Sequence, residues 1–224
     1  MVAAMTIPTL IANTRSQQYR SAFKKTVSVL GQAARMSQAQ YGFDYAGINQ
    51  LCGANAATEH PDNVMTVCSL LNGALTGSTY FERASDIPMK GSSKYTITRG
   101  PFMLADGVRV INNYRAYVLK DGTIVGIYKD MGLNTCTLSV GKTLNDLIGG
   151  NDEMRFCVGF IDVNGVSLPN KEVSCSSGSD SLKQNNCIVK NDAKHMTDIY
   201  PIRFHDGIVE PASAAARYVL KTAK

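Results

Sequence analysis

Apolar and small residues recur every three or four positions between residues 19 and 41. The stripe consists of Tyr19, Ala22, Phe23, Val27, Leu30, Ala33 and Ala34, with Ser37 and Tyr41 continuing it less regularly. This spacing places one apolar face along an α-helix. No glycine precedes Gly31, and Gly42 is a typical helix stop. The pattern predicts a helix over about residues 1–42, roughly 60 Å long at ~1.5 Å per residue, against an average of ~11–12 residues for a globular helix.

From residue 101 the pattern changes to short β-rich runs separated by Asp-Gly pairs. Asp-Gly between such runs predicts a hairpin, because glycine adopts positive φ without steric cost. Asp106-Gly107 and Asp121-Gly122 are the two pairs, and the strongest strand pattern covers 154–163. The flanking runs are 102–104, 108–111, 115–119 and 123–128. One helix followed by antiparallel strands indicates an α+β fold in which the long helix covers one face of the sheet.

The rest of the chain divides by composition around these elements. Residues 43–100 are rich in Gly, Ser, Asn and Thr and are expected to form a helix-to-sheet loop. A short helix is expected over 62–71, with Asp62 or Pro61 near its start and Gly73 as its stop. The core sheet is placed in 101–163, and 164–224 is a C-terminal region with a polar insert at about 171–197. Residues 43–224 thus form one globular domain after the helix.

Two stretches resemble a known family. The run Val2-Ala3-Ala4-Met5-Thr6-Ile7-Pro8-Thr9-Leu10-Ile11 is similar to the second half of the N-terminal helix of type IV pilins and type II secretion pseudopilins. There an apolar helix is interrupted by a proline, here Pro8, and continues as an amphipathic half. The C-terminal region resembles that family a second time, through runs at 160–165, 168–170, 198–200 and 206–211. The polar insert is similar to the disulfide-bounded surface loop of pilins.

The resemblance implies a specific biology for the chain. The family's leader peptide, and the first half of its apolar helix with an early acidic residue, do not occur before Val2. We therefore expect the chain to begin inside that helix. In the family this helix holds the subunit in the inner membrane and then packs with copies of itself in a filament. The implied fold is pilin-like, and Pro8 would act either as a hinge or as part of a frayed end.

Six cysteines indicate a disulfide framework: Cys52, Cys68, Cys136, Cys157, Cys175 and Cys187. The even count without a CxxC pair disfavours a redox motif or a zinc ribbon. Fifteen connectivities are possible for six cysteines. We expect sequential pairing, because each consecutive pair spans a short loop within one region. Disulfides predict an oxidising compartment, either the periplasm or the exterior.

The basic excess belongs to the helix. Residues 1–43 contain Arg15, Arg20, Lys24, Lys25 and Arg35 but no acid, so the remaining chain is neutral. A nucleic-acid interface would use such a stripe against phosphates, but we favour contact with lipid headgroups or with acidic faces of neighbouring subunits. The acids expected opposite the assembly helix are Asp44, Glu59, Asp62, Glu82 and Asp86.

Candidate chemistry is sparse. Asp162-x-Asn164-Gly165 offers oxygen ligands at alternate positions, as a calcium loop does, but the twelfth position is Val173 rather than a carboxylate. The simpler interpretation is a turn in which Asp162 and Asn164 bond the backbone. No cofactor is expected. The three histidines, His60, His195 and His205, accompany no GxSxG, HExxH or complete phosphate-loop motif, so an exported hydrolase is the least favoured hypothesis.

The sequence therefore predicts a structural subunit of a type IV pilus or a secretion pseudopilus, without enzymatic activity. Its partners would be copies of itself and other pilins in a helical filament, with the inner membrane as its location before assembly. After assembly it would lie in an extracellular pilus or a periplasmic pseudopilus. The alternative is a minor pilin whose disulfide loops bind a surface or a ligand.

Overall fold

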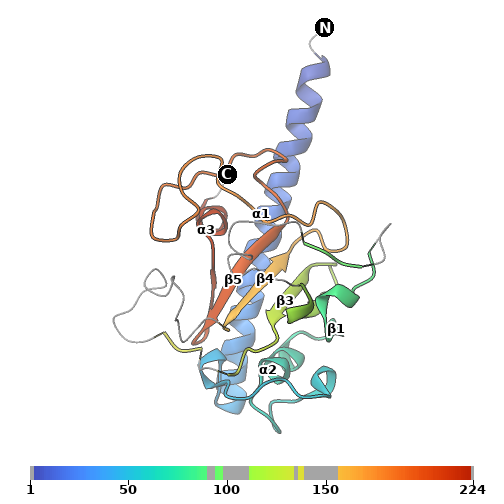
Figure 1. Ribbon diagram of the computed structural model, residues 1–224, viewed down its shortest axis with the longest axis vertical. Coiled ribbons are helices and arrows are strands. Elements are labelled where there is room, and N and C mark those ends of the chain that lie inside the picture. Colours follow the sequence, from blue (N-terminus) through green and yellow to red (C-terminus); the bar gives the residue numbers. More distant parts are fainter. Residues whose placement is uncertain (1–2, 90–93, 98–110, 134–135, 139–155, 223–224) are drawn as a thin grey trace.

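A long helix packed on an antiparallel sheet forms the frame of the protein (Figure 1). The computed structural model describes residues 3–89, 94–97, 111–133, 136–138 and 156–222, with side chains from residue 13 onward. Its helices are α1 (Ala3–Tyr41), α2 (Val67–Ala74) and α3 (Ala214–Lys221). Short 3-10 helices occur at Tyr45–Gly47, Ala56–Thr58, Ala84–Asp86 and Ile111–Asn113. The α+β class predicted from the sequence is confirmed.

The sheet has six strands in chain order, and every neighbouring pair is antiparallel. The strands are β1 (Thr79–Phe81), β2 (Tyr114–Val118), β3 (Ile124–Tyr128), β4 (Val158–Asp162), β5 (Ile199–His205) and β6 (Ile208–Pro211). The β2–β3 hairpin turns at the expected Asp121-Gly122, where Gly122 has φ +86°. β4 occupies the second half of the strand expected at 154–163.

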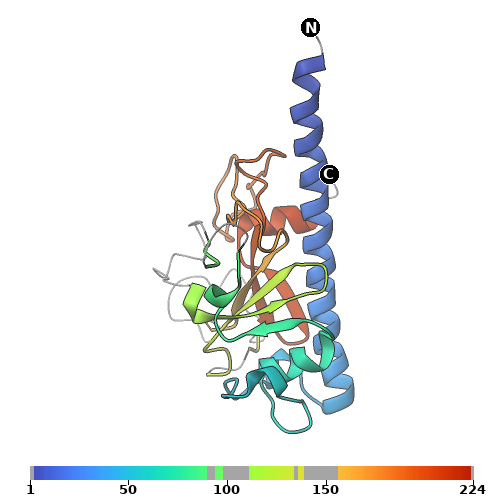
Figure 2. The ribbon, with the colours of Figure 1, turned by 90° about the vertical axis from the view of Figure 1, so that its right-hand side faces the viewer.

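One face of the sheet packs against α1 and α3 (Figures 1 and 2). Phe23 and Leu30, two residues of the apolar stripe, are fully buried. The Phe23 ring stacks on that of Tyr200 in β5, with centroids 4.3 Å apart and an interplanar angle of 15°. The hydroxyl of Tyr45 donates to the Leu30 carbonyl at 2.9 Å, which ties the chain after α1 back to the helix.

The opposite face of the sheet carries a smaller apolar cluster. Its centre is Phe160 of β4, which lies against Tyr95 and Tyr114. A Cβ atom at Gly126 would stand 2.0 Å from the Phe160 ring, so glycine is what lets β3 pass beneath it. Alternate strand residues point to opposite faces of the sheet. Because one apolar cluster covers each face, the strands are largely buried.

The long helix ends as predicted but differs at Pro8. Gly42 follows the last helical residue with φ +80°, a conformation that glycine adopts without strain. The expected interruption at Pro8 is wrong for the backbone, because α1 is continuous from Ala3. Pro8 has no backbone N–H, so it removes one hydrogen bond of the helix without ending it.

The expected helix at 62–71 is displaced toward the C-terminus. α2 begins after Thr66, whose hydroxyl accepts from the Ser69 N–H at 3.0 Å while the Ser69 hydroxyl accepts from the Thr66 N–H at 3.2 Å. This capping box fixes the start, whereas residues 61–63 form a turn. Gly73, the expected stop, lies inside α2.

The sheet extends beyond the expected core segment of 101–163. β1 lies in the region expected to be a loop, and β5 and β6 bring the C-terminal region back to the sheet, as the resemblance implied. α3 was not predicted. The expected hairpin around Asp106-Gly107 lies outside the described residues.

Candidate functional site

The N-terminal part of α1 is the most distinctive feature of the molecule. Its first turns extend beyond every other described element, whereas the remainder lies along the sheet (Figures 1 and 2). The first buried side chains described on the helix are those of Ser16, Tyr19 and Arg20. The projecting turns carry the apolar run at 2–11. The helix thus has a seated part, from about Ser16 to Tyr41, and a projecting part before it.

Arg20 and Lys24 fasten the seated part to the C-terminal end of the chain. Arg20 is 4% exposed; one guanidinium NH2 group donates to the Thr222 hydroxyl and the other to Asn191 Oδ1 at 3.1 Å. Lys24 Nζ donates to the Thr222 carbonyl at 2.8 Å. The Arg20 guanidinium also lies 5.9 Å from the centroid of the Tyr218 ring. Burial lowers the pKa of Arg20, although the guanidinium keeps its charge.

These contacts revise the role expected for the basic residues of the helix. Lys25 pairs with Asp121 of the β2–β3 turn at 2.8 Å, so its charge is also used within the subunit. Arg15 is exposed. Because Arg20, Lys24 and Lys25 bind groups of their own domain, they are not a free set of charges for neighbouring subunits. Sequence reasoning missed this, since Asn191 and Thr222 are distant in the chain and only the fold brings them together.

The outward face of the seated helix is polar. Ser21, Lys25, Ser28, Gln32 and Arg35 are exposed at steps of three and four. This face meets water in the single chain without a continuous apolar strip. The seated part therefore supplies the domain core, and no extended apolar surface remains on it for further packing.

Three disulfides join Cys52 to Cys68, Cys136 to Cys157 and Cys175 to Cys187. These are the sequential pairs expected from the sequence. The first ties the loop after α1 to α2, the second ties the Cys136 segment to the chain just before β4, and the third closes the polar insert. Three disulfides place this domain in an oxidising, extracytoplasmic compartment.

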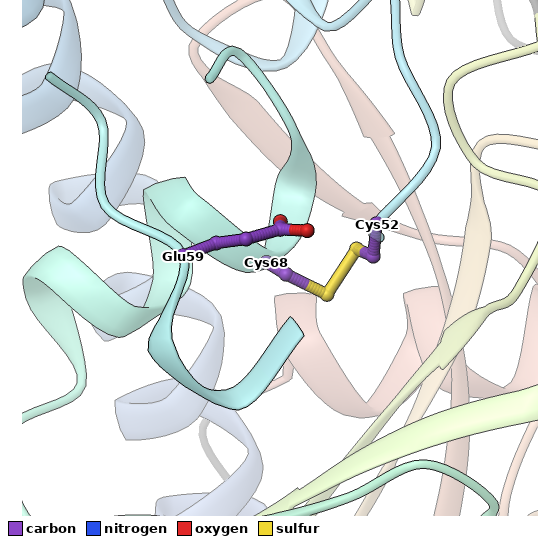
Figure 3. A group of neighbouring side chains, drawn as sticks. All are labelled: Cys52, Glu59 and Cys68. Atoms are coloured by element: carbon purple, nitrogen blue, oxygen red, sulfur yellow. A yellow bond between two sulfur atoms is a disulfide. The ribbon is translucent and has the colours of Figure 1, made fainter. Parts of the chain in front are cut away.

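Two groups of side chains within the described residues bring possible metal donors within 4.8 Å of one another. One consists of Cys52, Glu59 and Cys68, shown in Figure 3, and the other of Cys175, Asp180 and Cys187. In both, the sulfur atoms are bonded to each other and offer no thiolate, which is the form that binds metals. Glu59 instead accepts hydrogen bonds from the Gly53 N–H and the Thr66 hydroxyl. Both groups are structural.

Asp162 and Asn164, the calcium candidates, form a hydrogen-bonded turn. Asp162 is fully buried, and its Oδ1 accepts from the backbone N–H groups of Asn164 at 3.0 Å and Gly165 at 2.9 Å. Its Oδ2 accepts from the Tyr95 hydroxyl. The Asn164 side chain donates its NH2 group to the carbonyls of Ser167 and Leu168, each at 3.0 Å. The geometry favours the turn over a calcium loop.

A second buried carboxylate supports the same turn. Asp198 is fully buried and accepts from the backbone N–H groups of Asn170 at 3.0 Å and Lys171 at 2.8 Å. Burial, and then the charge of Asp198, raise the pKa of Asp162 well above its usual range. Burial also raises the pKa of Asp198. This pair orders the start of the insert. No sequence signal pointed to Tyr95, because its contact spans distant parts of the chain.

Each histidine pairs with a carboxylate of a nearby residue. His60 lies 2.9 Å from Asp62, His195 lies 2.8 Å from Asp192, and His205 lies 3.0 Å from Asp206. Burial alone would lower the pKa of His205, but its interactions with Glu210 and Asp206 outweigh burial and raise it. These pairs are local, within three residues along the chain, and fit a structural role.

No helix among the described residues combines the length and the hydrophobicity that crossing a bilayer requires. Comparison of the chain with protein-family models, with curated proteins and with solved structures gave no match.

Proposed function

We propose that this chain is a structural subunit of a filament of the type IV pilus or secretion pseudopilus kind, assembled through its N-terminal helix. The observation that carries the proposal is the division of α1 into a seated part and a projecting part (Figure 2). A lone helix exposing apolar residues to water is unfavourable, so the projecting turns need an apolar environment outside the domain. Copies of the same helix provide that environment in a filament.

The other described features support assembly rather than chemistry. The disulfides and the buried carboxylate turn rigidify loops at the surface of the domain, and the histidines are bound to local carboxylates. The sheet packs on one face of the seated helix, whose opposite face is polar, so we expect the globular domain to fold without the projecting turns. Among the described residues, the exposed large apolar side chains of the domain are scattered over several segments, whereas the projecting turns carry the apolar run at 2–11.

The proposal is tested by site-specific photo-crosslinking in cells that produce the complete gene product. A photoreactive side chain replaces Leu10 in the projecting part or, as the control, Ser28 on the exposed polar face. We expect crosslinks between copies from position 10, in a fraction sheared from the cell surface or held in the envelope. Position 28 should give far fewer. Crosslinks from position 10 only to lipid or to unrelated proteins, with no filament by electron microscopy, would refute the proposal.

A further inference from the structure

The two ends of the domain carry opposite charge. We define the shoulder as the end from which α1 projects: residues 15–24, the insert 171–197 and the end of α3 at 217–222. We define the foot as the opposite end: residues 43–78, which include α2 and lie beside the C-terminal end of α1. The insert and the foot lie at opposite ends of the domain in both views (Figures 1 and 2).

The shoulder is basic. The hydrogen bonds of Arg20 and Lys24 to Asn191 and Thr222 hold its three segments together. It contains nine basic residues, namely Arg15, Arg20, Lys24, Lys171, Lys183, Lys190, Lys194, Arg217 and Lys221. Its acids are Glu172, which is buried, and two others, Asp180 and Asp192. Asp192 accepts from the backbone N–H of His195 at 2.9 Å and pairs with its ring. Lys183, Lys190, Lys194 and Lys221 are exposed.

The foot is acidic. No lysine or arginine occurs anywhere between residues 36 and 82. The foot contains Asp44, Glu59 and Asp62, and the Asp62 side chain is 66% exposed. Asp206 of the β5–β6 turn lies beside it, since its carbonyl accepts from the Tyr45 N–H at 3.2 Å. Arg115 also borders the foot, where it donates to the Cys52 carbonyl at 3.2 Å, but its charge is paired with Glu82. The charge separation therefore runs along the axis of α1.

From this polarity we infer that the shoulder of one copy binds the foot of the next copy along the filament. The inference rests on the proposed function. In a stack of copies with parallel helices, the shoulder of each domain faces the foot of the domain beyond it. Such a contact joins two different surfaces and leaves one of each unpaired at the ends, so it propagates as an open helical array rather than closing as a dimer. Opposite charge also selects the parallel orientation, because an inverted copy would bring like charges together.

The contacts within the subunit also show which of the acids expected from the sequence is available for a contact between copies. Glu82 pairs with Arg115 at 3.0 Å and Asp86 pairs with Arg83 at 3.0 Å, so both are used within the subunit. Asp44 and Glu59 hold backbone N–H groups of the foot. Asp62 is the most exposed of the five and is bonded only to its neighbour His60 among the described contacts. The contact between copies therefore centres on Asp62 and on the lysines of the insert, rather than on the helix bases.

Charge reversal at each end tests the inference in cells producing the complete protein. The shoulder variant is Lys190→Glu with Lys194→Glu, and the foot variant is Asp62→Lys with Asn63→Lys. We expect each to reduce the filament yield about tenfold or more, because like charges then face each other across the contact. The combined variant should assemble better than either alone, since the reversed side chains are again opposite in sign. The matched control, Lys120→Glu with Lys129→Glu, makes the same charge change as the shoulder variant at exposed positions away from the shoulder. Because Lys120 lies beside Gly77 of the foot, its reversal adds to the negative charge of the foot and does not oppose the basic shoulder, so the control should assemble normally.

Each outcome decides a different point. Normal thermal unfolding of the purified variants shows that they fold, so a loss of filaments then reflects assembly. Normal filaments from the shoulder or foot variant, or no gain from combining them, would overturn the inference while leaving the proposed function intact. Absence of filaments from the wild-type protein would refute both. If the wild-type chain binds phosphatidylglycerol vesicles, the shoulder variant does not, and the foot variant assembles normally, the shoulder is a lipid-binding surface and the inference fails.

Discussion

Replacing Phe23 with alanine tests whether the packing of α1 on the sheet holds the domain together. Phe23 is fully buried and its ring stacks on Tyr200, which is also fully buried. Truncating a core phenylalanine costs ~3–5 kcal/mol through lost transfer energy and the residual cavity. An aromatic pair adds ~0.5–1.5 kcal/mol beyond its buried area. Because β5 lies between β4 and β6 and has little room to collapse, we expect a loss near the upper end, about 4–5 kcal/mol.

The measurement is urea unfolding under non-oxidative, non-reducing conditions that keep all three disulfides closed. The chain has ten tyrosines and no tryptophan, so tyrosine fluorescence and far-UV circular dichroism are the two probes. A domain of this size shifts its Tm by ~2–4 °C per kcal/mol, which predicts a fall of roughly 8–20 °C. Ser21→Ala is the control on the exposed face of the same helix and should stay within ~0.5 kcal/mol.

A loss below about 1 kcal/mol for Phe23→Ala, or one equal to that of Ser21→Ala, would contradict this reasoning. It would mean that the ring contact with Tyr200 does not hold the helix, and that the polar contacts of Arg20 and Lys24 do so instead. An unchanged denaturant slope is required for the comparison, because a changed slope would report a different extent of unfolding.

Further predictions follow from the buried polar groups and the disulfides. The partners of His205 raise its pKa above the ordinary ~6.5. The stability that His205 contributes is therefore full below pH ~6.5 and is lost as the pH rises through the pKa of the folded state. His205→Gln should remove this pH dependence, measured as Tm against pH. The pKa of Asp162 is also raised, so its contribution is present below its ordinary value of 3.8 and lost as the pH rises through the folded-state value. Asp162→Asn, which keeps an acceptor for the Asn164 and Gly165 N–H groups, should therefore gain stability relative to the wild type from acidic to neutral pH. Millimolar calcium should leave the wild-type Tm unchanged, and a rise in Tm that Asp162→Asn abolishes would restore the calcium hypothesis. Replacing both Cys175 and Cys187 with serine should cost about 3 kcal/mol from the loop that they close, and an unchanged urea midpoint would show that the insert is ordered without this disulfide.

The features that the sequence predicted are those encoded locally. The stripe through Phe23 and Leu30 predicted the buried face of α1, and Gly42 predicted its end. Asp121-Gly122 predicted the β2–β3 turn. The α3 helix was not predicted, although its start has a local signal: Ser213 precedes three alanines, and its hydroxyl accepts from the Ala216 N–H at 3.1 Å as an N-cap does. The start of α2 was misplaced because Asp62 and Thr66 are both good capping residues, and only the pairing with Ser69 selects Thr66.

The features that the sequence could not predict depend on contacts between distant segments. The bond between Tyr95 and Asp162 and the bonds from Arg20 to Asn191 and Thr222 join residues far apart in the chain. Periodicity identifies Arg20 only as a basic residue on a helix, and its burial appears once α3 and the insert close over it. The charge of α1 was therefore read as a free basic stripe, whereas much of it is used to hold the C-terminal segments in place.

The division of α1 separates folding from assembly. From Ser16 onward one face of the helix is buried against the sheet and the other is polar, so this length completes its interactions within one chain. We expect the apolar attraction between the helices of different copies to come from the residues before Ser16, and the orientation of the copies from charges on the domain. Substitutions at Phe23 or Leu30 should lower the stability of the isolated domain, whereas substitutions at Leu10 or Lys190 should change association and leave that stability unaltered. A change at Leu10 that destabilised the purified monomer as much as Leu30→Ala would show that the projecting turns belong to the domain core, and the division would not hold.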